Sequence, residues 1–277
     1  MGDSRLTKNQ PESKSTRVIA IVNQKGGVGK TTTTINLAAA LTQLGQTVML
    51  IDLDPQGNAT TGLGARRGQR DITLYDIIVE EADLAGAQVQ SGVPGLLLVA
   101  SDMDLSSAEL QIANSPNRTT RLKNAITKYT PKPDYILIDC PPSLSLLTVN
   151  ALAAADSVIV PLQCEFFALE GLSQLLKTVE MAKAEINPGL VIDGVMLTMY
   201  DKRNRLSDQV AADVRKHLGR AVFKTMIPRN VRIAEAPSFG KPVLQYDPYC
   251  AGSQAYMKLG REVLRRHKRT VKTGGRA

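Results

Sequence analysis

Lys25-Gly26-Gly27-Val28-Gly29-Lys30-Thr31-Thr32 joins a short apolar run at 18–22 to a stretch with helical spacing that opens at Lys30. Glycines in a turn between a strand and a helix let backbone N–H groups converge on phosphate oxygens, and the helix N-terminus adds a partial positive charge. Lys30 is placed to reach the β- and γ-phosphates of a nucleotide, and the Thr31 hydroxyl to hold Mg²⁺. The segment therefore predicts a phosphate-binding loop, or P-loop.

This loop departs from the general P-loop pattern G-x-x-x-x-G-K-[ST]. The first glycine of that pattern would fall at position 24, where Gln24 stands. A second lysine, Lys25, stands beside the glycine pair instead. The variant with two lysines is more specific than the general pattern. The alternative interpretation of the segment is a glycine-rich turn with incidental lysines.

The rest of the chain repeats short apolar runs that are bounded by turn residues. They lie at residues 18–22, 48–51, 96–100, 135–138, 157–161, 191–198 and 222–227, with helical spacing between them at, for example, 31–44 and 169–186. Strands that are apolar on both faces and alternate with helices are typical of a mostly parallel sheet covered on both sides. The pattern predicts one doubly wound α/β domain at 17–269, after a disordered arm at 1–16 and before a basic flexible tail at 270–277.

Two of the predicted strands end in aspartates. Strand 48–51 runs into Asp52 and Asp54, which would share one side, and strand 135–138 runs into Asp139. The carboxyl ends of parallel strands face the ligand crevice of such a sheet. A carboxylate there can order the water ligands of Mg²⁺, and another can position the water that attacks a phosphate. Asp54 and Asp139 are predicted site residues, with a helix cap or a turn as the alternative role.

The net charge of +8 is concentrated near the C-terminus. Segments 201–241 and 258–277 together hold 18 Lys and Arg against 5 acidic residues, so the rest of the 277-residue chain carries −5. Confined positive charge is expected for binding a polyanion such as nucleic acid or an acidic membrane surface, and a solvated basic face is the alternative. Aromatic residues make up 4% and are not interleaved with these charges, which argues against single-strand binding by base stacking.

Membrane spans and disulfides are not indicated by the sequence. No apolar stretch approaches the roughly 18 residues of a membrane span, and residues 1–17 lack the apolar core of a secretory signal. We therefore expect a cytoplasmic location. Cys140, Cys164 and Cys250 are widely spaced, which fits neither a zinc site nor a disulfide framework, so we expect them to pack in the interior.

Four segments resemble, in order, the motifs of the ParA/Soj type of DNA partition ATPases, which belong to the deviant Walker A group. They are residues 25–32, 52–58, 138–143 and 227–242, and the resemblance covers about 17–264. It implies a slow Mg²⁺-dependent ATPase for chromosome or plasmid partition. ATP would drive formation of a homodimer that binds double-stranded DNA without sequence preference, and a ParB-type centromere-binding protein would stimulate the hydrolysis that releases it. Association with the nucleoid follows.

The resemblance also implies roles for single residues. Lys25 matches the lysine that reaches the partner's phosphates across an ATP-sandwiched dimer, and Asp54 matches the residue needed for hydrolysis. The expected catalytic residues are Lys25, Lys30 and Asp54. The expected nucleotide contacts are Lys25, Gly26, Gly27, Val28, Gly29, Lys30, Thr31 and Thr32, with Pro228 and Asn230 at the adenine base. The expected metal contacts are Thr31 and, through water, Asp139 and Asp54.

Basic residues near the C-terminal end of the chain are the expected DNA contacts. They are Arg203, Lys224, Arg232 and Lys241. Arg203 has the most specific support, because residues 199–204 resemble the family's loop at that place. For each of the four, a solvated surface charge is the alternative.

Two relatives with the same nucleotide loop are competing interpretations. A MinD-like membrane ATPase would end in an amphipathic helix, and residues 256–264 have apolar side chains at helical spacing. A last helix packed on the core explains the same spacing, and we prefer it. A redox protein like the nitrogenase iron protein would use cysteines such as Cys140 and Cys164 for a shared iron–sulfur cluster. Residues 161–171, around Cys164, resemble partition ATPases instead.

Overall fold

The computed structural model of the protein describes residues 16–65, 72–166 and 168–274, with side chains up to residue 268. Of the predicted N-terminal arm, only Thr16 lies within these residues. Its hydroxyl donates a hydrogen bond to the carbonyl oxygen of Pro133 at 2.7 Å. The chain is therefore joined to the folded domain at the last residue of the predicted arm.

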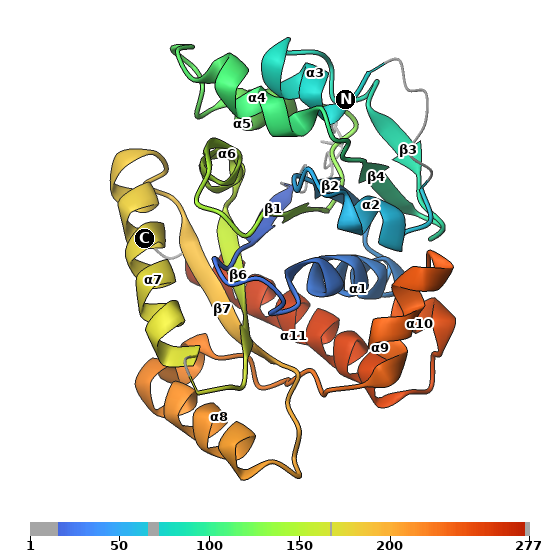
Figure 1. The fold of residues 1–277 in the computed structure, drawn as a ribbon, viewed down its shortest axis with the longest axis vertical. Coiled ribbons are helices and arrows are strands. Elements are labelled where there is room, and N and C mark those ends of the chain that lie inside the picture. Colours follow the sequence, from blue (N-terminus) through green and yellow to red (C-terminus); the bar gives the residue numbers. More distant parts are fainter. Residues whose placement is uncertain (1–15, 66–71, 167, 275–277) are drawn as a thin grey trace, which may run out of the picture.

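A seven-stranded sheet forms the centre of the fold, in the order β3-β4-β2-β5-β1-β6-β7 (Figure 1). Its strands are β1 (Arg17–Ile21), β2 (Val48–Asp52), β3 (Gln88–Gln90), β4 (Leu96–Val99), β5 (Tyr135–Asp139), β6 (Ser157–Gln163) and β7 (Val191–Thr198). Neighbouring strands pair in parallel, except that β3 runs antiparallel to β4 at one edge. The prediction of a mostly parallel sheet is confirmed.

One predicted strand, residues 222–227, is wrong. This segment runs beside β7 without forming a strand: an isolated bridge joins Val195 and Val222, and the N–H groups of Phe223 and Ile227 donate to the carbonyl oxygens of Val195 and Leu197, each at 2.9 Å. Glu262, from the last helix, accepts hydrogen bonds from the backbone N–H groups of Lys224 and Thr225 at 2.8 and 2.9 Å, so these donors do not join a ladder. Three apolar residues of the segment are nevertheless buried, because Phe223 and Ile227 pack in the cluster that contains α11 and Val222 in the cluster on the other face.

Helices cover both faces of the sheet, and the buried residues form one cluster on each face. The first face packs against α1 (Lys30–Gln43), α2 (Asn58–Gly62), α10 (Val243–Tyr246) and α11 (Ala251–Gly274), with α9 (Val231–Glu235) beside them. The second face packs against α3 (Leu74–Val79), α4 (Leu105–Ile112), α5 (Arg121–Lys128), α6 (Leu146–Ala154), α7 (Ala168–Glu185) and α8 (Arg205–Leu218). Helices on both faces of a mostly parallel sheet make the predicted doubly wound architecture.

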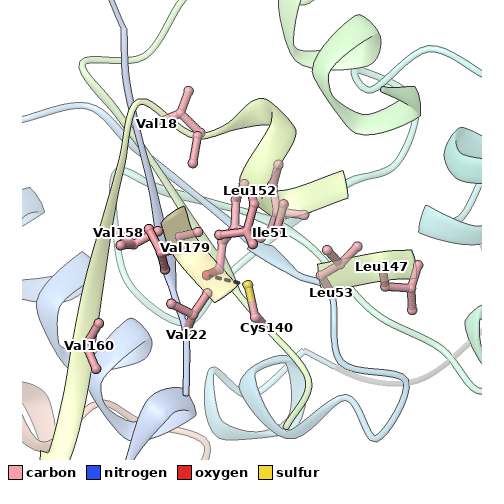
Figure 2. Packing of buried hydrophobic residues seen from close by; sticks show 14 of the residues in the cluster. Val18, Val22, Ile51, Leu53, Cys140, Leu147, Leu152, Val158, Val160 and Val179 are labelled. Atoms are coloured by element: carbon pink, nitrogen blue, oxygen red, sulfur yellow. Dashed lines mark hydrogen bonds between the residues drawn. The ribbon is translucent and has the colours of Figure 1, made fainter. Parts of the chain in front are cut away.

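The second cluster lies around the carboxyl ends of the central strands. Figure 2 shows residues of this cluster, among them Val22 and Cys140, which follow β1 and β5, together with Leu53, Leu147 and Val160. Each of these side chains is at most 4% exposed. A dense apolar layer therefore packs on one face of these strand ends, and their polar residues lie on the other face.

The last helix, α11, packs along α1 (Figure 1). Tyr256, Leu259 and Val263 are at most 1% exposed there. A Cβ added to Gly260 would lie 3.1 Å from the Leu44 side chain and 3.2 Å from that of Ala40, so glycine permits the close approach. The apolar face of α11 thus belongs to the core, as preferred over a membrane-binding face. Within the described part of the chain, no helix has the length and apolar character to cross a membrane.

The predicted domain boundary at residue 269 falls inside α11. The helix continues to Gly274, because no Gly or Pro stands between residues 261 and 273 to end it. Residues 275–277 of the predicted tail lie outside the described residues.

Candidate nucleotide-binding site

The loop between β1 and α1 is held by side chains from neighbouring strands. The Asn23 side chain connects the loop to β6. Its amide donates to the carbonyl oxygen of Pro161 at 2.7 Å, and its Oδ1 accepts from the backbone N–H of Lys25 at 3.0 Å. Thr198, at the end of β7, donates to the carbonyl oxygen of Val28 at 2.9 Å. Strands β6 and β7 therefore help to set the shape of the loop.

Two glycines give this loop its path. Gly27 and Gly29 have φ angles of 76° and 90°, in the left-handed region that favours glycine. No atom lies within 4 Å of a Cβ added at Gly26 or Gly27, so the backbone faces open space. Among the described residues, no side chain caps the start of α1. The first N–H groups of α1 are thus available to phosphate oxygens.

Lys30, the first residue of α1, folds back toward the loop. Its Nζ lies 3.3 Å from the carbonyl oxygen of Lys25, and the residue is 7% exposed. Burial lowers the pKa of Lys30 from its ordinary value, and the nearby Asp139 and Asp54 act in the opposite direction. A cation held between a backbone cradle and two acids is suited to bind the phosphates of a nucleotide.

Two buried carboxylates lie side by side at the carboxyl ends of neighbouring strands. Asp52 and Asp139 are Cα partners in β2 and β5, and both are 0% exposed. Asp139 accepts a hydrogen bond from the Thr34 hydroxyl at 2.9 Å. Asp52 accepts from both the backbone N–H and the hydroxyl of Thr60, each at 2.7 Å. Burial raises the pKa of each carboxyl above its ordinary value.

The second carboxylate oxygen of Asp139 indicates that the site binds a ligand. This Oδ2 is buried and has no hydrogen-bond partner among the described residues. Leaving a buried acceptor unsatisfied is costly, so a ligand or water is expected there. The Thr31 side chain, at the start of the P-loop helix, lies near Asp139 and lowers the pKa of this carboxyl against the effect of burial. These residues fit a Mg²⁺ whose water ligands Asp139 orders.

The metal would depend on the nucleotide for further ligands. Within the described part of the chain, no group of three or more His, Cys, Asp or Glu side chains could hold a metal ion. Phosphate oxygens, the Thr31 hydroxyl and water are the ligands that Mg²⁺ takes in phosphoryl-transfer sites. The donor set therefore fits Mg²⁺ that arrives together with a nucleotide.

Asp54 lies in the loop after β2 and is 7% exposed. Its Oδ1 accepts from the backbone N–H of Gln56 at 3.0 Å, and its carbonyl oxygen accepts from Gly57 at 2.8 Å. The electrostatic effect of Asp54 on Lys30 shows that the carboxylate lies close to the P-loop. The structure thus brings together Lys30, Asp54 and Asp139, as the sequence predicted.

Lys25 differs from Lys30 in where its ammonium group lies. Its Nζ forms an ion pair with Glu165, in the turn between β6 and α7, and its side chain is 50% exposed. The backbone of Lys25 belongs to the loop, but its charge is paired outside it. The two lysines therefore have different surroundings within one loop.

The predicted adenine contacts lie beside the end of β7. Tyr200 exchanges backbone hydrogen bonds with this segment: its N–H donates to Ile227 at 3.0 Å, and its carbonyl oxygen accepts from Arg229 at 2.9 Å. Pro228 lies between these two residues, and Asn230 caps α9 by accepting from the backbone N–H of Arg232 at 2.9 Å. Thr198 of β7 holds the P-loop, so Pro228 and Asn230 lie, like that loop, at the carboxyl ends of the strands.

The four predicted DNA contacts have different surroundings. Arg203 is bound by both oxygens of Asp201, at 3.0 and 2.9 Å. Arg232 pairs with Glu235 at 3.0 Å and with Asp247 at 3.5 Å. The other two, Lys224 and Lys241, are exposed, and Lys241 precedes α10. Of the four, Lys224 lines a groove beside α11.

A groove of about 580 Å³ lies between residues 224–228 and α11. Its basic lining residues are Lys224, Lys258, Arg261 and Arg265. None of these four has an ion-pair partner within the described residues. The acid in the lining, Glu262, is 6% exposed and already accepts hydrogen bonds from the Lys224 and Thr225 backbone. The groove therefore presents positive charge that ion pairs within the described part of the chain do not neutralise.

The cysteines do not fit a cluster shared between subunits. Cys140 and Cys164 are buried, and Cys250 is partly buried. Burial raises the pKa of Cys164 to about 11 and that of Cys140 well above its ordinary value. Because thiolates bind iron–sulfur clusters, thiols held protonated in the interior are poor ligands.

Sequence reasoning missed four residues that shape the site. They are Asn23, Thr34, Glu165 and Thr198. Thr34 stands one helical turn after Lys30, which could have indicated that both face the same carboxylate. Glu165 and Thr198 follow strands far along the chain, and no local pattern predicts their contact with the loop.

Comparisons with known proteins identify the family. A family model described as an AAA domain matches residues 16–192. The chain is 58% identical over 258 residues to the chromosome partitioning protein ParA of Caulobacter vibrioides, across 91% of this chain and 95% of that protein. It is 49% identical over 247 residues to the sporulation initiation inhibitor protein Soj of Bacillus subtilis, across 89% and 98%.

A solved structure with this fold carries a nucleotide. Cobyrinic acid a,c-diamide synthase from Mycobacterium smegmatis, crystallised with ADP and magnesium, is similar with a TM-score of 0.80 and 36% identity, over 92% of this chain and 96% of that one. One family is indicated by the sheet, by the loop with two lysines and by the long matches to partition proteins. The chain belongs to the ParA/Soj family of chromosome-partitioning ATPases.

Proposed function

We propose that the protein is a DNA-segregation switch in which ATP drives homodimerisation, the dimer binds double-stranded DNA without sequence preference, and hydrolysis releases the DNA. The observation that carries the proposal is that the two lysines of the loop have different surroundings. Lys30 is buried beside the phosphate cradle, whereas the Lys25 ammonium lies outside it and is half exposed. A second lysine directed away from its own cradle is suited to act on another protomer.

The nucleotide would be held by the P-loop backbone from Lys25 to Thr32, with Lys30 at the phosphates. Thr31 would bind Mg²⁺ directly, and Asp139 through water, because the free oxygen of Asp139 is buried beside this helix start. Asp54 would position the attacking water, with a water-mediated metal contact as its second role. Pro228 and Asn230 would contact adenine. Mg²⁺ bound to ATP neutralises phosphate charge that develops during hydrolysis.

Lys25 would supply charge in trans. A cation contributed by the other subunit makes hydrolysis depend on assembly, as an arginine finger does in other P-loop enzymes. The fixed backbone of Lys25 and its half-exposed side chain are compatible with that reach. Hydrolysis would therefore be slow in separate protomers and faster in the dimer.

DNA binding would centre on the groove beside α11. Its four basic residues, Lys224, Lys258, Arg261 and Arg265, have no ion-pair partners within the described residues, unlike Arg203 and Arg232. Arg203, Arg232 and Lys241 remain proposed contacts, and they are not among the residues that line this groove. Each neutralised phosphate releases about one counterion, and a dimer joins two such surfaces. The ATP-bound dimer should therefore bind DNA far more tightly than a single protomer.

The proposed partner is a ParB-type centromere-binding protein that stimulates hydrolysis through a basic N-terminal peptide. Family membership supports this partner, and the relatives named chromosome-partitioning proteins favour a chromosome over a plasmid as cargo. Binding to bulk DNA would associate the protein with the nucleoid. The packing of α11 on α1 supports DNA rather than a membrane as the surface that is bound.

Parallel binding assays test this choice of surface. With ATP and Mg²⁺, the protein should co-sediment with duplex DNA and should not float with anionic liposomes made of phosphatidylglycerol and phosphatidylethanolamine. The same assays with ADP should show weak binding to both. Flotation with the liposomes and no binding to DNA would overturn the proposal in favour of a membrane ATPase.

A further inference from the structure

We infer that Glu165 is a positioning residue for Lys25: it holds the lysine in cis in the separate protomer, and this ion pair must break when an ATP dimer forms. The inference rests on the proposed role of Lys25 in trans. It adds an intramolecular competitor for the cation that the partner's phosphates require.

The Lys25 backbone is fixed, so only its side chain is free to change partner. Its N–H donates to Asn23, and its carbonyl oxygen accepts from the Lys30 ammonium. The ammonium of Lys25 meets the Glu165 carboxylate at the end of a flexible four-carbon stem. The side chains of Lys25 and Glu165 are 50% and 34% exposed, so both are accessible to an incoming protomer.

Glu165 is presented by a turn that the fold holds beside the P-loop. Its N–H donates to the carbonyl oxygen of Gln163, the last residue of β6, at 2.9 Å, and its own carbonyl oxygen accepts from Ala168, the first residue of α7, at 3.0 Å. On the loop side, the Gln24 amide donates to the Thr178 hydroxyl of α7 at 3.2 Å. The Glu165 carboxylate is therefore kept within reach of Lys25.

Charge balance explains why this pair would regulate assembly. The ammonium of Lys30 lies near Asp139 and Asp54, which raise its pKa against the effect of burial. The ion-pair partner of Lys25 in the described structure is Glu165. The triphosphate group of ATP offers several anionic oxygens, so it competes for the Lys25 ammonium better than one carboxylate does. Exchange of Glu165 for the partner's phosphates is therefore favourable only when ATP is bound.

The size of the effect follows from the exposure of the pair. An exposed ion pair typically changes an equilibrium constant by about 1.5- to 5-fold. Dimer formation would break two such pairs, one in each protomer. Removing the Glu165 charge should therefore strengthen dimerisation by about 2- to 25-fold.

Glu165→Gln tests this inference, because glutamine keeps the shape of the side chain and removes its charge. The matched control is Glu170→Gln, an exposed acid in the first turn of α7. The dimer dissociation constant is measured by sedimentation with a non-hydrolysable ATP analogue and Mg²⁺. It should fall about 2- to 25-fold for Glu165→Gln and stay unchanged for Glu170→Gln. An unchanged or raised constant for Glu165→Gln would overturn the inference.

A double-mutant cycle separates this inference from the proposed function. In a Lys25→Ala background, Glu165→Gln should have no further effect on the dissociation constant, because its effect passes through Lys25. If Lys25→Ala alone left hydrolysis by the dimer unchanged, the trans role of Lys25 would be wrong. If Lys25→Ala slowed hydrolysis but Glu165→Gln acted equally with and without Lys25, only the cis ion pair would be wrong.

Discussion

Lys25 and Lys30 are five residues apart in one loop, yet their surroundings give them different chemistry. Lys30 is buried beside two carboxylates, and Lys25 is half exposed and paired with Glu165. Local sequence was sufficient to select both lysines, Asp54 after β2 and Asp139 at the end of β5 as candidates, since these residues lie in or beside the strand-to-loop turns. It was insufficient for Glu165 and Thr198, whose contacts with the loop depend on how distant strands pair.

Replacing Lys30 should remove nucleotide binding. The Lys30→Ala variant loses the cation beside the phosphate cradle, and charge-assisted contacts of this kind are worth about 1.5–3 kcal/mol each. The dissociation constant for a fluorescent ATP analogue should therefore rise by at least about tenfold. Lys177→Ala, an exposed lysine on α7, is the control and should bind normally.

Asp54→Ala should separate nucleotide binding from hydrolysis. Asp54 lies near Lys30 without being its main neighbour, so ATP should still bind and drive dimerisation. Loss of a group that positions water should slow single-turnover hydrolysis by about 100-fold or more. The ATP dimer should then persist on DNA in a dissociation assay. Hydrolysis at the normal rate would show that the role assigned to Asp54 is wrong.

Elements that are regular and apolar were predicted more reliably than irregular ones. Strands β1, β2 and β5 are apolar runs that end in polar turns, and their positions agree with the prediction. The short edge strand β3 has the sequence QVQ, which carries no such signal. Residues 222–227 are as apolar as a strand, but Glu262 accepts hydrogen bonds from the N–H groups of Lys224 and Thr225 in the middle of the segment. Burial by a helix and burial in a sheet produce the same local pattern.

The contact between α1 and α11 sets a limit on side-chain size at Gly260. A leucine there would push against Leu44 and Ala40, whose side chains lie 3.1 and 3.2 Å from an added Cβ. Overpacking of this kind costs about 1–3 kcal/mol, so Gly260→Leu should lower the free energy of unfolding by that amount. Urea denaturation measures it. Gly171→Leu on α7, where no atom lies within 4 Å of an added Cβ, should show no such loss.

At the scale of the whole molecule, four basic residues line the groove beside α11, and Pro228, a proposed adenine contact, lines the same groove. Sequence counting located the excess of Lys and Arg in the C-terminal quarter, but it could not show which of them acids already neutralise. Arg203 and Arg232 are paired, whereas the groove beside α11 keeps its four cations free of ion pairs in the described structure. Pairing of this kind depends on short contacts in the fold, which the charge count does not contain.

Removing charge from the groove should weaken DNA binding in a characteristic way. The Arg261→Ala/Arg265→Ala variant should reduce the slope of log K against log salt by about 2 for each protomer, because two phosphate contacts are lost. ATP hydrolysis without DNA should be unchanged. Lys123→Ala/Lys128→Ala, on α5 at the other face of the sheet, removes the same charge and should leave DNA binding as it was. Equal losses for both pairs would mean that only net charge matters.

Binding to duplex DNA, measured with and without ATP and Mg²⁺ across a salt series, tests the central claim most directly. Four basic groove residues in each of two protomers predict a slope of log K against log salt of about −7 with ATP. Without nucleotide, binding should be weak and the slope shallower, since separate protomers engage DNA singly. Equal affinity and equal slope with and without ATP would contradict the account of an ATP-driven, DNA-binding dimer.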